Sequence, residues 1–248
     1  MSTKKLTGKV ALVTGGSRGL GAAIAKRLAD DGAAVALTYT SSPQKADEVV
    51  FAIESAGGQA LAIRADSADV EAVRNAVAET VKVFGRLDIL VNNAGVAALA
   101  PIDQFSMDDF DRLVAVNIKG VFVATQEAVR HMGEGGRIVT IGSINSDLVP
   151  FAGGSVYALT KGAIAGFTRG LARDLGPRGI TVNNVQPGPT DTDMNPADGP
   201  FADGLKKMIA LGRYGQSSEI AGMVSYLASP EAAFVTGASL KIDGGFAA

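Results

Sequence analysis

The stretch Val10-Ala11-Leu12-Val13-Thr14-Gly15-Gly16-Ser17-Arg18-Gly19-Leu20-Gly21 decides the fold of this chain. Its apolar first part, Val10 to Thr14, is typical of a buried parallel strand, and a helix is expected from Gly19 to Asp31. Glycine lets a backbone approach a phosphate closely, and a helix N-terminus offers free N–H groups. Glycines between a first strand and a first helix therefore favour dinucleotide binding, although a merely tight turn would use the same residues.

Strand-like and helix-like segments alternate along the rest of the chain. Further strands are expected at 34–38, 59–64, 89–92, 137–141, 180–185 and 239–242, and further helices at 43–56, 69–84, 107–131 and 155–175. Repeated strand–helix units specify a parallel sheet with helices on both faces. We predict one α/β domain over residues 1–248, a Rossmann-type doubly wound parallel sheet of about seven strands.

One segment interrupts this alternation. Between residues 186 and 214 the chain carries four prolines and shows helical character only near 203–211. An excursion of this length is usually a functional lid or a disordered insert. It follows the carboxyl end of a strand, where open α/β sheets bind their ligands. We therefore expect a substrate lid at about 189–213.

Composition excludes several classes of function. The net charge is −2, from 23 basic and 25 acidic residues that are interspersed, so neither nucleic acid nor a membrane surface is expected as a partner. The chain has no cysteine and a single histidine, His131, so we expect no disulfide and no metal site. No apolar run approaches the length of a membrane span, and the first residues lack an apolar signal core. A cytoplasmic protein is expected.

The stretch Tyr157-Ala158-Leu159-Thr160-Lys161 places a phenol and an ammonium four residues apart, on one face of any helix. An ordinary phenol loses its proton only near pH ~10, and a neighbouring cation favours the phenolate. The pair is therefore interpreted as a general acid/base that exchanges a proton with a carbonyl oxygen. A tyrosine and a lysine on an exposed helix face would show the same spacing.

The end of the second expected strand indicates which dinucleotide fits. A site that prefers NAD(H) places a carboxylate there to bind the ribose hydroxyls, but this chain continues Tyr39-Thr40-Ser41-Ser42. Arg18 lies in the glycine turn, where its guanidinium can pair with a 2′-phosphate. The other interpretation of Arg18 is a solvent-facing turn residue. We predict NADP(H) as the cofactor, with NAD(H) less favoured.

With these motifs in place, nearly the whole chain resembles the short-chain dehydrogenase/reductase family, and within it the 3-oxoacyl-acyl-carrier-protein reductases and related NADP(H) carbonyl reductases. The motifs that carry the resemblance are the Thr14–Gly21 turn, Asn92-Asn93-Ala94-Gly95, Asn117 with Lys119-Gly120, Ser143, Tyr157 with Lys161, Pro187-Gly188 and Ile242-Asp243-Gly244-Gly245. Each motif alone is weak, but the full set in this order is specific.

The resemblance implies four catalytic roles. Tyr157 would give a proton to the substrate carbonyl, or take one from an alcohol. Lys161 would favour ionisation of that phenol and bind the nicotinamide ribose. Ser143 would donate a hydrogen bond to the carbonyl oxygen, and a turn cap after the fifth strand is its structural alternative. Asn117 would hold a water that links Lys161 to solvent.

The resemblance also implies which residues contact the cofactor. In chain order they are Gly15, Ser17, Arg18, Gly19, Leu20, Gly21, Tyr39, Thr40, Ser41, Asp66, Ser67, Asn93, Ala94, Gly95, Tyr157, Lys161, Pro187, Gly188, Thr190 and Thr192. Asp66 would contact the adenine amino group, although a lone acid there could equally cap a helix. Ser67 stands where the family usually has valine or leucine.

The activity that the resemblance implies is hydride transfer between NADP(H) and a ketone or secondary alcohol. The substrate would be a small ketone or a 3-oxoacyl thioester, the latter possible on an acyl carrier protein. Arg130, Arg169, Arg173 and Arg178 are available to dock an acidic carrier, although solvation of helix surfaces explains them equally well.

Two further expectations remain open. A nucleotide-binding sensor that keeps the fold without turnover is the alternative function, which the intact Tyr157, Lys161 and Ser143 make less favoured. The family is commonly tetrameric or dimeric, paired through the long helices and the C-terminal strand. We expect a homotetramer or a homodimer.

Overall fold

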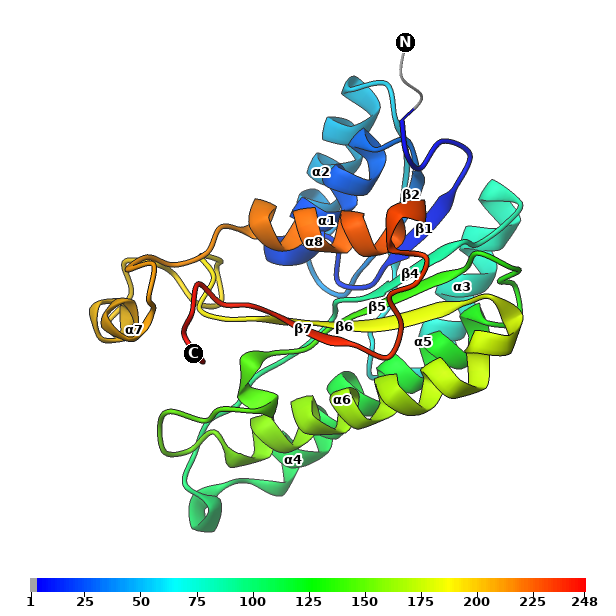
Figure 1. The fold of residues 1–248 in the computed structure, drawn as a ribbon. Helices are drawn as coiled ribbons and strands as arrows, with labels where there is room; N and C mark the ends of the chain where they lie inside the picture. The colour runs from blue at the N-terminus through cyan, green and yellow to red at the C-terminus, as the bar shows by residue number, and fades with distance from the viewer. Residues whose placement is uncertain (1–3) are drawn as a thin grey trace.

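The computed structural model describes residues 4–248, which form one seven-stranded parallel sheet in the order β3-β2-β1-β4-β5-β6-β7 (Figure 1). The strands are β1 (Val10–Val13), β2 (Ala34–Tyr39), β3 (Gln59–Arg64), β4 (Ile89–Asn92), β5 (Arg137–Ile141), β6 (Thr181–Pro187) and β7 (Ser239–Ile242). The order runs outward from β1 in both directions, so the chain switches direction between β1 and β4. The predicted doubly wound parallel sheet is confirmed.

Helices cover both faces of this sheet (Figure 1). One face carries α1 (Gly19–Asp30), α2 (Pro43–Ser55) and α8 (Ser217–Ala228), and the other carries α3 (Val70–Phe84), α4 (Met107–Val114), α5 (Val121–Ala128) and α6 (Ser155–Leu175). The short α7 (Ala202–Met208) lies beyond the carboxyl ends of the strands, near the C-terminus. This placement leaves the loops after the strands as the wall of a site.

The two helical layers are held by two separate hydrophobic clusters. Successive residues of a strand point to opposite faces. Val13 and Val91 therefore pack with α1 and α8, whereas their neighbours Leu12 and Leu90 pack with α3 and α5. Because both faces are buried, the central strands are continuous apolar runs rather than alternating ones, which explains why they were visible in the sequence.

One predicted helix is divided in the structure. The segment predicted as one helix over 107–131 consists of α4, a π-helical stretch at Ala115–Gly120, and α5, which ends at Ala128. A π turn inserts one extra residue into a helical turn and is frequent at functional sites. Here it contains Asn117, one of the predicted catalytic residues.

A second difference is α8, which the sequence analysis did not predict. A capping contact begins this helix, in which the Glu219 carboxylate accepts a hydrogen bond from the Gln216 N–H at 2.7 Å and the Glu219 N–H donates to the Gln216 carbonyl at 2.9 Å. Glutamine is an unusual first partner, because serine or threonine is the common one. α8 packs against α1 and completes the cover of that face.

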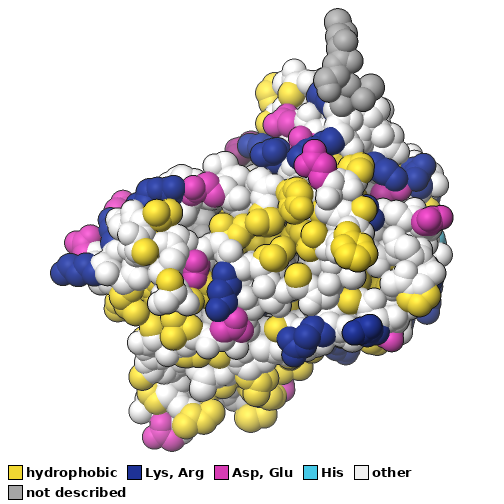
Figure 2. All heavy atoms as spheres, viewed as in Figure 1, with side chains coloured by type: hydrophobic (Ala, Val, Ile, Leu, Met, Phe, Trp, Pro, Cys, Tyr) yellow, Lys and Arg dark blue, Asp and Glu magenta, His cyan; other side chains and the backbone are white. Residues whose placement is uncertain are grey.

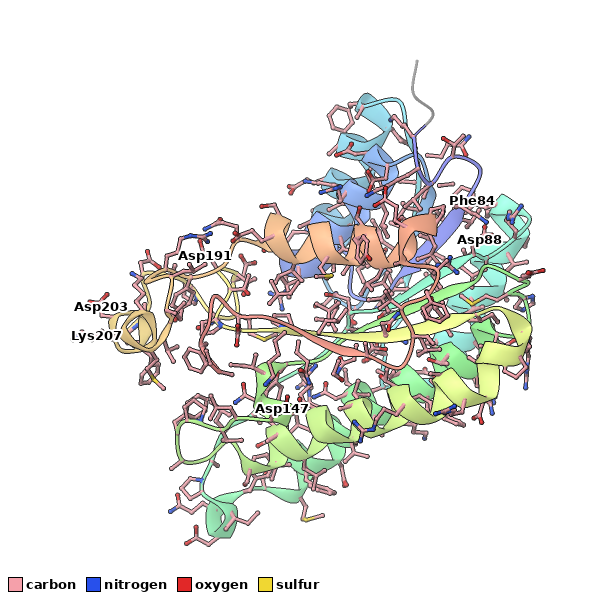
Figure 3. The ribbon with its side chains drawn as sticks, viewed as in Figure 1. Phe84, Asp88, Asp147, Asp191, Asp203 and Lys207 are labelled. Carbon is pink, nitrogen blue, oxygen red and sulfur yellow. The ribbon has the colours of Figure 1, made fainter. Side chains whose placement is uncertain are left out.

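Asp88 lies at the amino ends of the strands, just before β4 and far from Asp147 and Asp191 (Figure 3). Its carboxylate accepts hydrogen bonds from Arg86 at 2.6 and 2.8 Å, from Lys9 at 3.3 Å and from the Val10 N–H at 3.0 Å. Burial alone would raise the pKa of Asp88, but the hydrogen bonds from Arg86 and Val10 and the nearby cations outweigh it and lower the pKa. The ionised carboxylate therefore ties β1 to β4.

We expect Asp88→Asn to lower the free energy of unfolding by about 1–3 kcal/mol at neutral pH, since a charged acceptor is lost. The pKa of Asp88 is lower in the folded state, so its stabilisation is present above the unfolded value of ~3.9 and is lost as the pH falls through the folded value. Urea unfolding at neutral and acidic pH should show that the variant lacks this acid-dependent part. The exposed Asp47→Asn is the control, and equal acid sensitivity of wild type and Asp88→Asn would contradict the expectation.

Candidate active site

The glycine turn after β1 has a backbone conformation that lets a ligand approach it closely. Gly15 and Gly19 have φ of +64° and +53°, the left-handed region that favours glycine. The N–H of Gly15 donates to the hydroxyl of Thr38 at 3.0 Å, and that of Gly16 to the Thr38 carbonyl at 2.8 Å. The turn is therefore anchored to β2 and leads into α1, whose N-terminus it presents at the carboxyl edge of the sheet.

Thr14 and Asn93 tie this turn to the loop after β4. The Thr14 hydroxyl accepts hydrogen bonds from the N–H groups of Asn93 and Ala94, both at 3.0 Å. The Asn93 amide returns bonds to the carbonyls of Thr14 at 2.9 Å and Gly15 at 3.0 Å. The predicted contact residues Asn93 and Ala94 thus lie directly against the glycine turn. The bracing role of Thr14 was missed, because a threonine at a strand end has no distinctive spacing.

Lys161 lies buried on α6 beside Tyr157. Its ammonium donates to the Ile141 carbonyl at the end of β5 at 3.0 Å and lies 5.7 Å from the centroid of the Tyr157 ring. A methyl added to Gly95 would lie 3.7 Å from the Lys161 nitrogen, so this glycine keeps the space beside the ammonium free. The predicted pair is thus brought together, with a cation at the edge where the strands end.

Ser143 begins the short turn after β5. Its hydroxyl accepts a hydrogen bond from the Asn145 N–H at 3.1 Å and contacts the Asn145 side-chain oxygen at 3.0 Å. The capping interpretation of Ser143 therefore describes a contact that is present. Ser143 lies just beyond the carboxyl end of β5, whose last residue is Ile141, so the same hydroxyl can turn toward a ligand bound there.

Asn117 uses its side chain as a brace. Its oxygen accepts from the Val96 N–H at 2.9 Å, and its amide donates to the Val96 carbonyl at 2.9 Å and to Thr160 at 3.2 Å. These bonds join the loop after β4, the π turn and α6. The water relay through Asn117 stays a prediction. The sequence analysis did not single out Thr160, although a hydroxyl in the middle of a helix could have identified it. This hydroxyl also donates to the Tyr157 carbonyl at 2.8 Å.

The predicted adenosine contacts lie at the ends of β2 and β3. Thr40 and Ser41 are exposed just after β2, and Tyr39 packs partly against the hydrophobic cluster beneath α1. Asp66 is exposed and accepts from the Ala68 N–H at 2.9 Å. The helix cap after β3 is Asp69 rather than Asp66, so the capping alternative for Asp66 is wrong.

Ser67 and Gly188 are placed by packing of the backbone. A methyl on Gly120 would lie 2.3 Å from the Ser67 carbonyl oxygen, so the loop after β3 presses against the π turn. A methyl on Gly188 would lie 2.6 Å from Cβ of Asp243. The glycines of the Lys119-Gly120 and Pro187-Gly188 motifs are therefore needed for close contact between segments, whether or not a ligand is bound.

The expected lid leaves the sheet after β6 and returns at Gly215. Thr190 is buried and donates to the Gly188 carbonyl at 3.0 Å, while Thr192 pairs with Asn195 in a short bridge. The lid contains α7, and its apolar side chains pack with Ile144 and with the C-terminal segment. A cavity of ≈ 240 Å³ lies between the lid, α4 and the loop after β4, lined by Val96, Ala97, Ala98, Asp109, Arg112 and Met194.

Two kinds of site are not found within residues 4–248. No group of three or more histidine or acidic side chains is arranged to hold a metal ion in this part of the chain. No helix in the same range has the length and apolar character to cross a membrane.

The chain is similar to several known proteins along its whole length. A profile of the family described as Enoyl-(Acyl carrier protein) reductase matches residues 15–247. A "Cyclic-di-GMP-binding biofilm dispersal mediator protein" of Escherichia coli is 51% identical over 98% of each chain. A short-chain dehydrogenase/reductase of Serratia marcescens has a solved structure that is 61% identical, with a TM-score of 0.97 over 98% of this chain and 100% of its own.

A further solved structure contains a ligand. It is a short-chain dehydrogenase of Burkholderia cenocepacia in complex with NADP, 56% identical, with a TM-score of 0.97 over 98% of this chain and 100% of that one. Its similarity extends through the glycine turn, the loop after β4 and the segment of α6 described above, because the match covers nearly the whole chain.

The tight approach of α1 to the glycine turn can be tested by adding a single methyl group. In Gly21→Ala the new methyl would lie 2.3 Å from the Gly15 carbonyl oxygen and 2.5 Å from the Asn93 amide nitrogen. We expect a loss of about 1–3 kcal/mol in the free energy of unfolding, because overpacking forces the turn to move. In Gly204→Ala on α7, the matched control, the methyl meets no atom within 4 Å. Equal urea midpoints for the two variants would contradict this packing.

Proposed function

Because this chain belongs to the short-chain dehydrogenase/reductase family, we propose that it is an NADP(H)-dependent oxidoreductase that interconverts a ketone and a secondary alcohol. The observation that carries the proposal is the buried Lys161 ammonium, held by Ile141 beside the Tyr157 ring. The proposal treats the chain as one dinucleotide-binding and catalytic domain, with residues 189–213 as its lid. It places the reaction in the cytoplasm.

The residues present fit a dinucleotide. In the turn from Gly15 to Gly21, a methyl on Gly16 would lie 2.6 Å from Cβ of Leu37 and one on Gly21 2.3 Å from the Gly15 carbonyl oxygen. These glycines therefore let the turn pack closely and present the N-terminus of α1 to a pyrophosphate. Residues 40–45 after β2 contain no carboxylate, and Arg18 is exposed at the start of α1, where its guanidinium can meet a 2′-phosphate. NADP in the Burkholderia cenocepacia relative supports the same choice. When bound, NADPH supplies a hydride to the carbonyl carbon.

Side chains at the carboxyl ends of the strands then transfer the proton. As the carbonyl oxygen gains negative charge, the Tyr157 hydroxyl gives its proton to that oxygen, and in the oxidative direction the phenolate takes it from the alcohol. The Lys161 ammonium stabilises the phenolate that is left. Ser143 donates a second hydrogen bond to the oxygen, so that its developing charge meets donors already in place. Asn117 positions these groups by holding the loop after β4 against α6.

We favour a small ketone over a carrier-bound thioester, because two of the four arginines considered for docking a carrier protein already have partners. Of the four arginines considered for docking a carrier protein, Arg130 pairs with Glu127 at 2.8 Å, and Arg178 donates to the carbonyls of Val129 and Met132. These two cations are thus engaged within the chain. The cavity under the lid has an apolar wall of Val96, Ala97, Ala98 and Met194 and a charged one of Asp109 and Arg112, so it offers both apolar contact and polar groups to a small substrate.

A nucleotide-binding sensor is the second candidate function. Its support is the relative of Escherichia coli whose name describes cyclic-di-GMP binding and biofilm dispersal. That relative is 51% identical along nearly the whole chain, so a regulatory role of this chain is compatible with the same fold. The arrangement of Tyr157, Lys161 and Ser143 favours turnover, because binding alone needs no proton donor at the edge of the sheet.

The proposal includes a homotetramer or a homodimer. Phe122 and Leu159 are exposed on α5 and α6, and a methyl added to Gly162 of α6 would meet no atom within 4 Å. Figure 2 shows further hydrophobic side chains gathered on the face that carries α8 and the edge strand β7. An edge strand and an apolar helix face are surfaces that proteins commonly cover with a partner.

We expect Tyr157→Phe to lower turnover of a ketone by about 10²–10⁴-fold, because the proton donor is lost. Its affinity for NADPH should stay close to that of the wild type. Loss of NADPH absorbance over a panel of ketones measures the first quantity, and titration of NADPH measures the second. Tyr226→Phe on α8 is the matched control. Wild-type activity in Tyr157→Phe would overturn the mechanism, and a wild-type chain that binds NADPH but consumes none would favour the sensor.

We expect the purified chain to sediment as a species several times heavier than its 25.2 kDa monomer. Leu159→Lys should shift the population toward the monomer, because a charge would be buried in the contact between α6 helices. Phe51→Lys on α2, an exposed apolar position outside these faces, is the control. A wild-type chain found only as a monomer would remove this part of the proposal.

A further inference from the structure

An ion pair joins the lid to the first turn of α2, which follows the predicted adenosine contacts at the end of β2. The ammonium of Lys45 lies 2.9 Å from a carboxylate oxygen of Asp193, across 148 residues of sequence. Lys45 is in the first turn of α2, and Asp193 is in the lid. Both side chains are about half exposed, at 49% and 55%, so the pair lies at the surface where a ligand can reach it.

The position of Lys45 connects this pair to the cofactor. Lys45 follows the Tyr39–Ser42 segment at the end of β2, where dinucleotide-binding folds recognise the second ribose hydroxyl or its phosphate. The neighbouring lid residue Thr192 lies over the glycine turn, since a methyl added to Gly19 would be 3.7 Å from its methyl carbon. The lid therefore rests on the cofactor turn at Gly19 and is tied to α2 at Lys45.

The charges around Asp193 favour its ionised form. The hydrogen bond and charge of Lys45, with a smaller contribution from the charge of Arg18, lower the pKa of Asp193 below its usual value. Asp193 is thus an anion at neutral pH that is paired with the Lys45 ammonium. This ammonium is a cation that a 2′-phosphate on the ribose would also seek.

We propose that Asp193 is an internal anion that holds Lys45 until the 2′-phosphate of NADP(H) takes its place, which makes Lys45 and Asp193 determinants of cofactor specificity. The proposal rests on the proposed function, because it requires NADP(H) as the ligand. A phosphate carries more charge and more acceptor oxygens than a carboxylate, so it competes well for the Lys45 ammonium. An exposed ion pair contributes little stability, so its displacement costs little.

The proposal has a consequence for each cofactor. NADP(H) would gain Lys45 as a second cation but would have to displace Asp193, whereas NAD(H) would leave the ion pair intact. Asp193 should therefore weaken the binding of ligands that carry a 2′-phosphate and leave others unaffected. Removal of Lys45 should abolish this effect of Asp193, because the carboxylate then no longer masks a cation.

Calorimetric titration of four ligands separates these effects. Adenosine 2′,5′-bisphosphate and adenosine 5′-phosphate differ only in the 2′-phosphate and carry no nicotinamide, and NADPH and NADH form the matching full-length pair. The protein variants are wild type, Asp193→Asn, Lys45→Gln and the double variant. Asp198→Asn, an exposed acid of the same lid, is the control.

We expect Asp193→Asn to bind the two 2′-phosphorylated ligands about two- to fivefold more tightly, the range of exposed ion pairs, with no change for the other two. Lys45→Gln should bind them about three- to tenfold more weakly, since a charge-assisted bond to phosphate is lost. The double variant should match Lys45→Gln, and Asp198→Asn should match the wild type.

Three results would overturn the inference while leaving the proposed function intact. Equal changes for ligands with and without the 2′-phosphate would show that the ion pair only steadies the lid. Additive effects in the double variant would show that Asp193 does not act through Lys45. An Asp198→Asn variant that behaves like Asp193→Asn would reduce the effect to the general charge of the lid. If the wild type bound neither NADPH nor NADH, the proposed function itself would fail, and this inference with it.

Discussion

The hydrogen bond from the Lys161 ammonium to the Ile141 carbonyl is the interaction on which the site depends. It joins α6 to the end of β5 and holds a cation that is only 7% exposed. Within residues 4–248 no carboxylate pairs with this ammonium. A buried cation compensated by a single carbonyl is costly unless further groups share its charge. A phenolate and the hydroxyls of a ribose are groups of that kind, so a bound ligand would offset the cost of burying the Lys161 ammonium.

The rest of the edge keeps this ammonium in place. Parallel pairing brings the carboxyl ends of β1, β4 and β5 to one side, and Thr14 and Asn93 then join the first two of these ends. Asn117 and Thr160 connect the loop after β4 to α6, the helix of Lys161. Polar networks that are fully satisfied rigidify their surroundings. The lid is joined to this frame by the Lys45–Asp193 ion pair, by a hydrogen bond from the Leu211 N–H to the Gly244 carbonyl at 3.0 Å, and by packing with Ile144 and the C-terminal segment.

Much of the fold was predictable because its signals are local. Buried parallel strands are apolar runs, and the glycine turn and the Tyr157–Lys161 spacing are visible within a few residues. The sequence did not reveal the π turn around Asn117, whose side chain bonds to Val96 and Thr160 at positions distant along the chain. The pair of Lys45 and Asp193 was hidden for the same reason. α8 was missed because its glutamine cap lacks the usual first residue.

A crystal structure with NADPH and an unreactive ketone analogue tests the central claim most directly. The account predicts that the analogue's oxygen lies within hydrogen-bond reach, about 2.6–3.2 Å, of both the Tyr157 and the Ser143 hydroxyls. It also predicts that Lys161 remains on the Ile141 carbonyl and faces the ribose of the nicotinamide. A complex in which the nicotinamide binds away from Lys161, or in which the ketone oxygen contacts neither hydroxyl, would contradict the account.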